Sequence, residues 1–196
     1  MSFFDNTKVA GWGLFIIGII LIINAIIQIY DGATMPDDAL EKTGFIIAGV
    51  GALLAAFVFF GFGNSVRNGS ISNKIDILGK FVITYGIATI IANIFSAIGG
   101  AMSEISATDS IIWIIIGIII VIIGSKIGDG KTTTFDKILW VILLILFVIL
   151  FIGNLAGIVN ANGDVIAIIA NILYAIVYLY MIAFLFDGDV RKKMGI

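Results

Sequence analysis

Six apolar stretches of about 20 residues each dominate this sequence, and polar connectors separate them. As an α-helix, each stretch is long enough to cross the hydrocarbon core of a bilayer, which is about 30 Å thick. Hydrophobic side chains make up 61% of the 196 residues and charged side chains only 12%, unlike a water-soluble domain. We therefore predict an all-α integral membrane protein, a single domain (residues 1–196) with six transmembrane helices. The predicted spans are Val9–Tyr30, Gly44–Gly63, Phe81–Ala101, Ser110–Ile127, Ile138–Val159 and Val165–Phe186.

The first stretch has a competing interpretation as a secretory signal peptide, because Lys8 precedes an apolar run. A signal core is about 7–15 residues long and is followed by a small-x-small cleavage site. The run after Lys8 is longer than that, and no such site follows it. We interpret it as a membrane span.

Positive charge is distributed very unevenly between the connectors. Nine of the eleven lysines and arginines fall before the first span, in the connectors that follow the second and fourth spans, or in the tail; Lys126 is next to the fourth connector, and only Lys42 lies on the other side. Loops rich in lysine and arginine stay on the cytoplasmic side of a membrane. We predict a multi-pass protein of the cell (plasma) membrane with both termini in the cytoplasm. The strong excess of isoleucine over leucine favours AT-rich coding and a prokaryotic source.

The spans and connectors follow a pattern that occurs three times. Each unit begins with a polar helix start, rises through one span, turns, and returns to a segment with glycine and basic residues. Two helix starts share a spacing that suits an N-terminal cap, Asn73 with Asp76 and Thr133 with Asp136. The pattern predicts three tandem helical hairpins, at residues 1–69, 70–131 and 132–196, which an axis along the membrane normal can relate to one another.

Small residues recur every four positions on two of the predicted helices. Such rows allow helix backbones to approach closely within a membrane. We therefore predict close helix packing along both rows, either within one chain or between subunits. The rows are Gly44, Ala48, Ala52 and Ala56 on the second span, and Ala88, Ala92, Ser96 and Gly100 on the third.

Uncharged polar side chains are the candidate functional residues inside the membrane. At 1.5 Å per residue, Asn24, Asn93, Asn154 and Asn171 fall at a similar depth, and Tyr174 and Tyr178 share a helix face with Asn171. One interpretation is a set of interhelical hydrogen bonds that fix helix rotation. The other is a polar vestibule or binding site. The only charged residue within the spans is Lys126, next to the end of the fourth, so we expect no proton relay.

The chain contains no cysteine and no histidine. Without them a thiolate nucleophile, a cysteine metal site and the commonest general base are all missing. The basic residues form no face for nucleic acid. We therefore expect no metal, no cofactor and no enzymatic activity. The expected function is that of a helical bundle acting through packing, as a homo-oligomer or as a subunit of a larger membrane complex, with membrane lipid as its partner. The alternative is a passive channel or facilitator for a small neutral solute.

The apolar strings Leu14–Ile20 (LFIIGII) and Val50–Leu54 (VGALL) give the chain a family resemblance. Together with its length and repeated hairpins, they resemble the HdeD-like small membrane proteins of prokaryotes. The proline that often ends the first span in that family is replaced here by Asn24 and Ala25. The resemblance implies a six-span membrane protein linked to envelope stress, and it transfers no functional residue.

Overall fold

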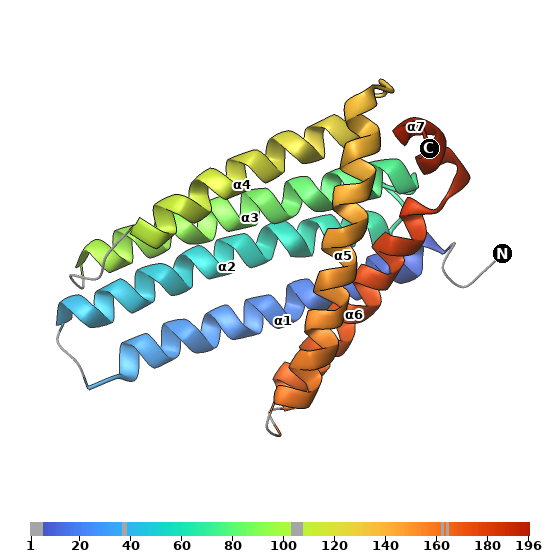
Figure 1. The fold of residues 1–196 in the computed structure, drawn as a ribbon. Helices are drawn as coiled ribbons and strands as arrows, with labels where there is room; N and C mark the ends of the chain where they lie inside the picture. Colours follow the sequence, from blue (N-terminus) through green and yellow to red (C-terminus); the bar gives the residue numbers. More distant parts are fainter. Residues whose placement is uncertain (1–5, 37–38, 103–107, 162, 164) are drawn as a thin grey trace.

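The computed structural model describes residues 6–36, 39–102, 108–161, 163 and 165–196 (Figure 1). Within these residues the chain is helical and has no strand, which confirms the predicted all-α class. Six helices are long and apolar enough to cross a membrane, and a short seventh follows them. The helices are α1 (Thr7–Thr34), α2 (Ala39–Arg67), α3 (Lys74–Met102), α4 (Thr108–Ile127), α5 (Thr134–Asn160), α6 (Val165–Leu185) and α7 (Gly188–Met194).

The first three helices extend well beyond the predicted spans. The connector between the first two predicted spans is shorter than the sequence suggested, because α1 continues to Thr34 and α2 begins at Ala39. Pro36 explains where α1 ends, since a residue before proline is driven out of the helical region. Met35 is accordingly extended, with ψ 150°. A helix of 28 residues is about 42 Å long, so its polar ends project beyond the hydrocarbon core.

Both predicted helix caps are present. The side-chain oxygen of Asn73 accepts a hydrogen bond from the backbone N–H of Ile75 at 2.8 Å. The backbone N–H of Thr133 donates to Asp136 Oδ2 at 2.6 Å, and the Thr133 hydroxyl donates to the same oxygen at 2.7 Å. These bonds satisfy groups that a helix start otherwise leaves unpaired. They place the starts of α3 and α5 where the sequence predicted.

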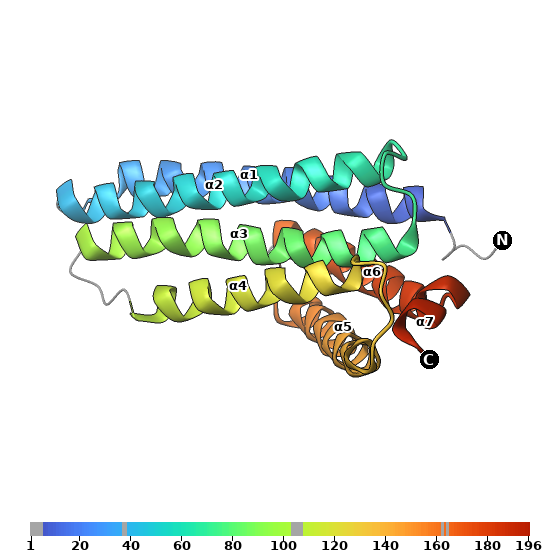
Figure 2. The same cartoon turned by 90° about the horizontal axis from the view of Figure 1, so that it is seen from above.

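Helices α1 to α4 lie side by side in one antiparallel layer, and the α5–α6 hairpin crosses this layer at a steep angle (Figures 1 and 2). The start of α1, the α2–α3 and α4–α5 connectors and α7 all lie at one end of the molecule, which we call the basic end. This end gathers the segments that carry ten of the eleven basic residues. The third hairpin therefore differs in placement from the first two, and the threefold repeat stays a prediction from the sequence.

Glycines spaced seven residues apart hold the layer together. A Cβ atom on Gly18 of α1 would lie 2.6 Å from the Cα atom of Phe60, and one on Gly63 of α2 would lie 2.5 Å from the backbone nitrogen of Phe15. The α3–α4 pair repeats this arrangement, with Gly86 and Gly117 in mutual backbone contact. A period of seven keeps one helix face against a partner in left-handed packing. Such contacts include Gly11, Gly18, Gly32, Gly49 and Gly63 between α1 and α2, and Gly79, Gly86, Gly117 and Gly124 between α3 and α4.

The predicted four-residue rows have mixed positions in this packing. Gly44 lies directly against Gly99, so the first member of the α2 row does bring two helices together within the chain. Ala56 and Ala88 are buried, whereas Ala48, Ala52, Ala92, Ser96 and Gly100 are half-buried. The shortest distance from an added Cβ to a backbone atom, between Gly99 and the Gly44 carbonyl oxygen, involves a member of the four-residue row, and the seven-residue glycines provide further close approaches.

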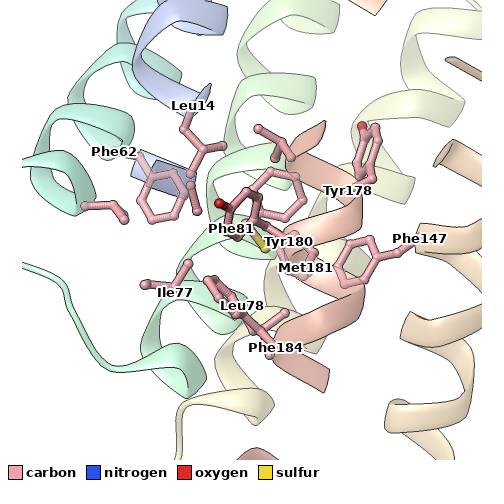
Figure 3. Close-up of a cluster of buried hydrophobic side chains, with 14 of the residues drawn as sticks. Leu14, Phe62, Ile77, Leu78, Phe81, Phe147, Tyr178, Tyr180, Met181 and Phe184 are labelled. Carbon is pink, nitrogen blue, oxygen red and sulfur yellow. The ribbon is translucent and has the colours of Figure 1, made fainter. Parts of the chain in front are cut away.

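An aromatic core joins the crossing hairpin to the layer near the basic end (Figure 3). Gly13 of α1 lies under Val177 of α6, where an added Cβ would be 2.9 Å from a valine methyl group. The indole N–H of Trp140 donates to the Leu185 carbonyl at 2.8 Å and ties α5 to the end of α6. The residues labelled in the core are Leu14, Phe62, Ile77, Leu78, Phe81, Phe147, Tyr178, Tyr180, Met181 and Phe184.

Ion pairs fasten the C-terminal helix across the basic end. The ammonium of Lys193, 7% exposed, lies 3.0 Å from Asp136 Oδ1 and 3.4 Å from Asp129 Oδ1. Lys74 at the start of α3 pairs with Asp187, whose other oxygen caps α7 through the N–H of Asp189. This hydrogen bond from Lys74 lowers the pKa of the Asp187 carboxyl from its ordinary value. Helix α7 therefore links α3 and α5 outside the membrane spans.

We predict that Gly63→Ala destabilises the protein, whereas Gly61→Ala does not. An alanine methyl at position 63 would overlap the α1 backbone, and overpacking of this kind costs about 1–3 kcal/mol. Nothing lies within 4 Å of the corresponding position at Gly61, so the higher helix propensity of alanine adds up to about 1 kcal/mol there. Thermal unfolding in detergent measures both. Equal midpoints for the two variants would contradict the close α1–α2 approach.

We predict that Asp187→Asn lowers stability at neutral pH by about 0.2–1 kcal/mol, the value of a partly exposed ion pair. Asparagine keeps the cap of α7, so the variant removes chiefly the pair with Lys74. Because folding lowers the pKa of Asp187, its contribution exists above the unfolded pKa and is lost as the pH falls through the folded pKa. The two proteins should therefore converge in unfolding midpoint below about pH 3. Asp189→Asn is the control, and a gap that persists in acid would refute the pair.

Candidate functional site

A cavity of about 370 Å³ lies between α6 and the helical layer. It borders the aromatic core through Phe81 and Tyr178, which belong to both. Five helices contribute to it, so residues far apart in the sequence meet there. Its lining consists of Leu21 from α1, Ala52, Ala55, Ala56 and Phe59 from α2, Phe81, Tyr85, Ala88, Thr89, Ala92 and Asn93 from α3, Trp113 from α4, and Tyr174 and Tyr178 from α6.

Five alanines on α2 and α3 explain why this space stays open. Helix α6 touches α1 at Gly13 and Val177 and crosses the layer obliquely, so the two surfaces diverge away from that contact. Larger side chains would fill the widening gap, but Ala52, Ala88 and Ala92 present only methyl groups to it. Half of each predicted packing row therefore lines the cavity.

A polar stripe on α3 forms one wall. Tyr85, Thr89 and Asn93 are four residues apart and share one helix face. The Thr89 hydroxyl donates to the Tyr85 carbonyl at 2.9 Å, and the Asn93 amide nitrogen donates to the Thr89 carbonyl at 2.8 Å. The Thr89 hydroxyl and one amide N–H of Asn93 therefore donate within α3, whereas the second amide N–H of Asn93 and the side-chain oxygens of both residues remain available.

Two tyrosines of α6 form the opposite wall. The rings of Tyr174 and Tyr178 stack with centroids 6.2 Å apart, and Tyr178 also contacts Phe81 at 6.2 Å and Phe147 at 6.3 Å. Tyr178 is only 5% exposed, and Figure 3 shows its hydroxyl pointing away from Phe184. No described residue hydrogen-bonds to either tyrosine hydroxyl. Because no fully buried polar side-chain atom among the described residues lacks a partner, the Tyr178 hydroxyl reaches open space.

The structure brings three of the six predicted polar residues together. Asn93, Tyr174 and Tyr178 line the cavity, and the other three lie outside its lining. Asn24 is exposed on α1. Asn154 donates to the Leu150 carbonyl of its own helix at 2.7 Å, and Asn171 packs against Gly157 of α5. One amide N–H of Asn93 and one of Asn154 thus donate within their own helices, where the sequence suggested bonds between helices.

Two other residues of the site were not assigned from the sequence as candidates. Tyr85 and Thr89 precede Asn93 at four-residue intervals, and this i, i+4, i+8 polar stripe was the available signal. Trp113 is near the start of the fourth predicted span, a position typical of an aromatic residue at the membrane surface. It lines the cavity because α4 packs beside α3 through Gly86 and Gly117.

Two further cavities have different chemistry. One of about 310 Å³ between α3, α4 and α5 is lined almost entirely by carbon, from residues such as Ile120, Leu146 and Leu150. Another of about 370 Å³ at the basic end includes Asp76, Asp189 and Lys193. Within the described parts of the chain, no three carboxylate, histidine or cysteine side chains are grouped as a metal site requires.

We predict that Tyr178→Phe changes the free energy of unfolding by less than about 0.5 kcal/mol, because its hydroxyl makes no hydrogen bond within the described residues. Tyr178→Ala should cost about 3–5 kcal/mol, because the ring packs on Phe81 and Phe147 in the core. Thermal unfolding in detergent separates the two. A large loss for Tyr178→Phe would mean that the hydroxyl has a partner and does not face the cavity.

Comparison of the chain with family models, with characterised proteins and with solved structures finds no match. The resemblance to HdeD-like proteins therefore stays a prediction from the sequence pattern. The function has to be inferred from the side chains that the fold brings together. The cavity between α6 and the layer is the place where polar groups from separate helices meet inside the spans.

Proposed function

We propose that this integral membrane protein is not an enzyme and acts through helix packing and assembly, as a homo-oligomer or as a subunit of a larger membrane complex. The main support is the outer surface of α4, which carries large apolar side chains along its length. They include Ile112 (49% exposed), Ile115 (53%), Ile119 (51%) and Ile122 (58%). Such a surface is suited to lipid and to apolar helices of other subunits.

The proposed orientation of the protein in the membrane rests on the basic end. Lysine and arginine there favour the cytoplasmic side of a plasma membrane. The opposite turns of the first two hairpins would then face the exterior. A resemblance to HdeD-like proteins agrees with a small prokaryotic membrane protein of this type.

A passive facilitator for a small neutral solute is the second candidate. It is favoured by the polar walls of the cavity, where Tyr85, Thr89 and Asn93 face Tyr174 and Tyr178. The aromatic core weighs against it, because Phe81, Tyr180 and Phe184 are packed between the cavity and the basic end. A facilitator would require those rings to move aside during each passage.

Reconstituted protein distinguishes the two candidates. Native mass spectrometry from nanodiscs should give a mass above that of one 20.9 kDa chain, and glycerol flux into proteoliposomes should equal that of empty liposomes. A monomeric mass together with rapid flux would refute the assembly function and support the facilitator. In that case Asn93→Leu should reduce flux, and Asn154→Leu, outside the cavity lining, should not.

A further inference from the structure

We propose that the cavity between α6 and the helical layer is a binding site for a neutral, single-chain lipid that carries a hydroxyl group. This goes beyond a function in packing and assembly, because it assigns a ligand to a specific intramembrane space. The lining residues of the cavity come from five helices of the chain. Three properties of the site lead to this class of ligand.

The first property is the arrangement of donors and acceptors. On the α3 side, the side-chain oxygens of Thr89 and Asn93 accept no hydrogen bond from a described residue, while the Thr89 hydroxyl and one amide N–H of Asn93 donate within the helix. On the α6 side, the hydroxyls of Tyr174 and Tyr178 make no bond to a described residue and can donate. A ligand hydroxyl both donates and accepts, so it can bridge the two walls. The lipid chains of the bilayer offer no such partner.

The second property is the absence of charge from the lining. Every lining residue is uncharged, and Asn93 is 12 residues beyond Phe81, about 18 Å along α3. A phosphate or ammonium group at that depth would have no counter-ion among the lining residues, and burying such a charge is costly. The site therefore selects a neutral polar group over the headgroup of a phospholipid.

The third property is the size and material of the walls. The volume of about 370 Å³ is at the small end of the range for ligand pockets, roughly 300–1,000 Å³. Alanine methyl groups and the rings of Phe59, Phe81 and Trp113 provide an apolar surface for one chain. The neighbouring carbon-lined cavity shares Phe81, Tyr85, Trp113 and Tyr178 with this one, but lacks Thr89 and Asn93. It would hold an acyl chain without selecting a headgroup.

Trp113 provides a reporter inside the site. The protein would be placed in phosphatidylcholine nanodiscs and titrated with a dibrominated long-chain alcohol, whose bromine atoms quench tryptophan on contact. A dibrominated phosphatidylcholine of the same chain length is the comparison probe. The difference in fluorescence quenching between the wild-type protein and the Trp113→Phe variant gives the contribution of Trp113 in the cavity. Trp12 stacks under Arg67 and Trp140 binds Leu185, both at the basic end, so they report non-specific quenching.

We expect the alcohol to quench Trp113 at a lower mole fraction than the phospholipid does. Asn93→Leu should raise the mole fraction needed by about three- to tenfold, the value of one hydrogen bond. Tyr174→Phe should act in the same direction. Asn154→Leu is the matched control, because Asn154 is also half-buried and also donates to the carbonyl four residues earlier, but lies outside the lining. Its midpoint should be unchanged.

Equal quenching of Trp113 by the alcohol and the phospholipid would overturn the proposal, since the cavity would then be ordinary bilayer space. An unchanged midpoint for both Asn93→Leu and Tyr174→Phe would overturn it as well. A shift of the quenching midpoint for Asn154→Leu equal to that for Asn93→Leu would also overturn it. Unfolding midpoints show whether each variant folds. If Asn93→Leu fails to fold, Tyr174→Phe tests the same site. Failure of the assembly function would appear in the mass measurement and leaves these outcomes unaffected.

Discussion

Close approach of helix backbones at glycine residues is the constraint on which the rest of this structure depends. Within a bilayer, lipid tails compete with side chains for apolar contact, so helices gain by approaching closely. Gly18 and Gly63 allow α1 and α2 to approach until backbone meets backbone, and Gly86 and Gly117 do the same for α3 and α4. The two hairpins become a layer with fixed rotation about each helix. That rotation presents the alanines and the polar stripe of α3 to the crossing hairpin.

The crossing of α6 over this layer creates both the core and the cavity. Near the basic end, Gly13 brings α6 close to α1, and large aromatic side chains fill the space between the elements. Farther along, the same helix moves away from the layer, and alanine leaves the gap unfilled. The crossing of α6 over the layer thus explains why the densely packed aromatic core lies beside an open cavity. It also explains why Tyr178 belongs to both the core and the lining of the cavity.

Much of the fold could be predicted because membrane burial leaves a strong local signal. The six spans follow from length and apolarity, and the caps at Asn73 and Thr133 follow from residue type and spacing. The helix ends were harder, because a helix can continue past the hydrocarbon core wherever no proline stops it, as at the start of α2. Our prediction of helix packing used rows of small residues at four-residue spacing and did not include the glycines at seven-residue spacing.

The site was only partly predictable, because the depth of a residue along its helix does not indicate how the helix is rotated about its axis or which helix it packs against. Asn24, Asn93, Asn154 and Asn171 were expected at one level, yet only Asn93 lines the cavity. The sequence by itself determined that six helices cross the membrane and that the basic segments alternate with the others, because both depend on local composition. The tertiary structure alone decided which polar groups meet, because the crossing of α6 over α1 sets which faces oppose each other.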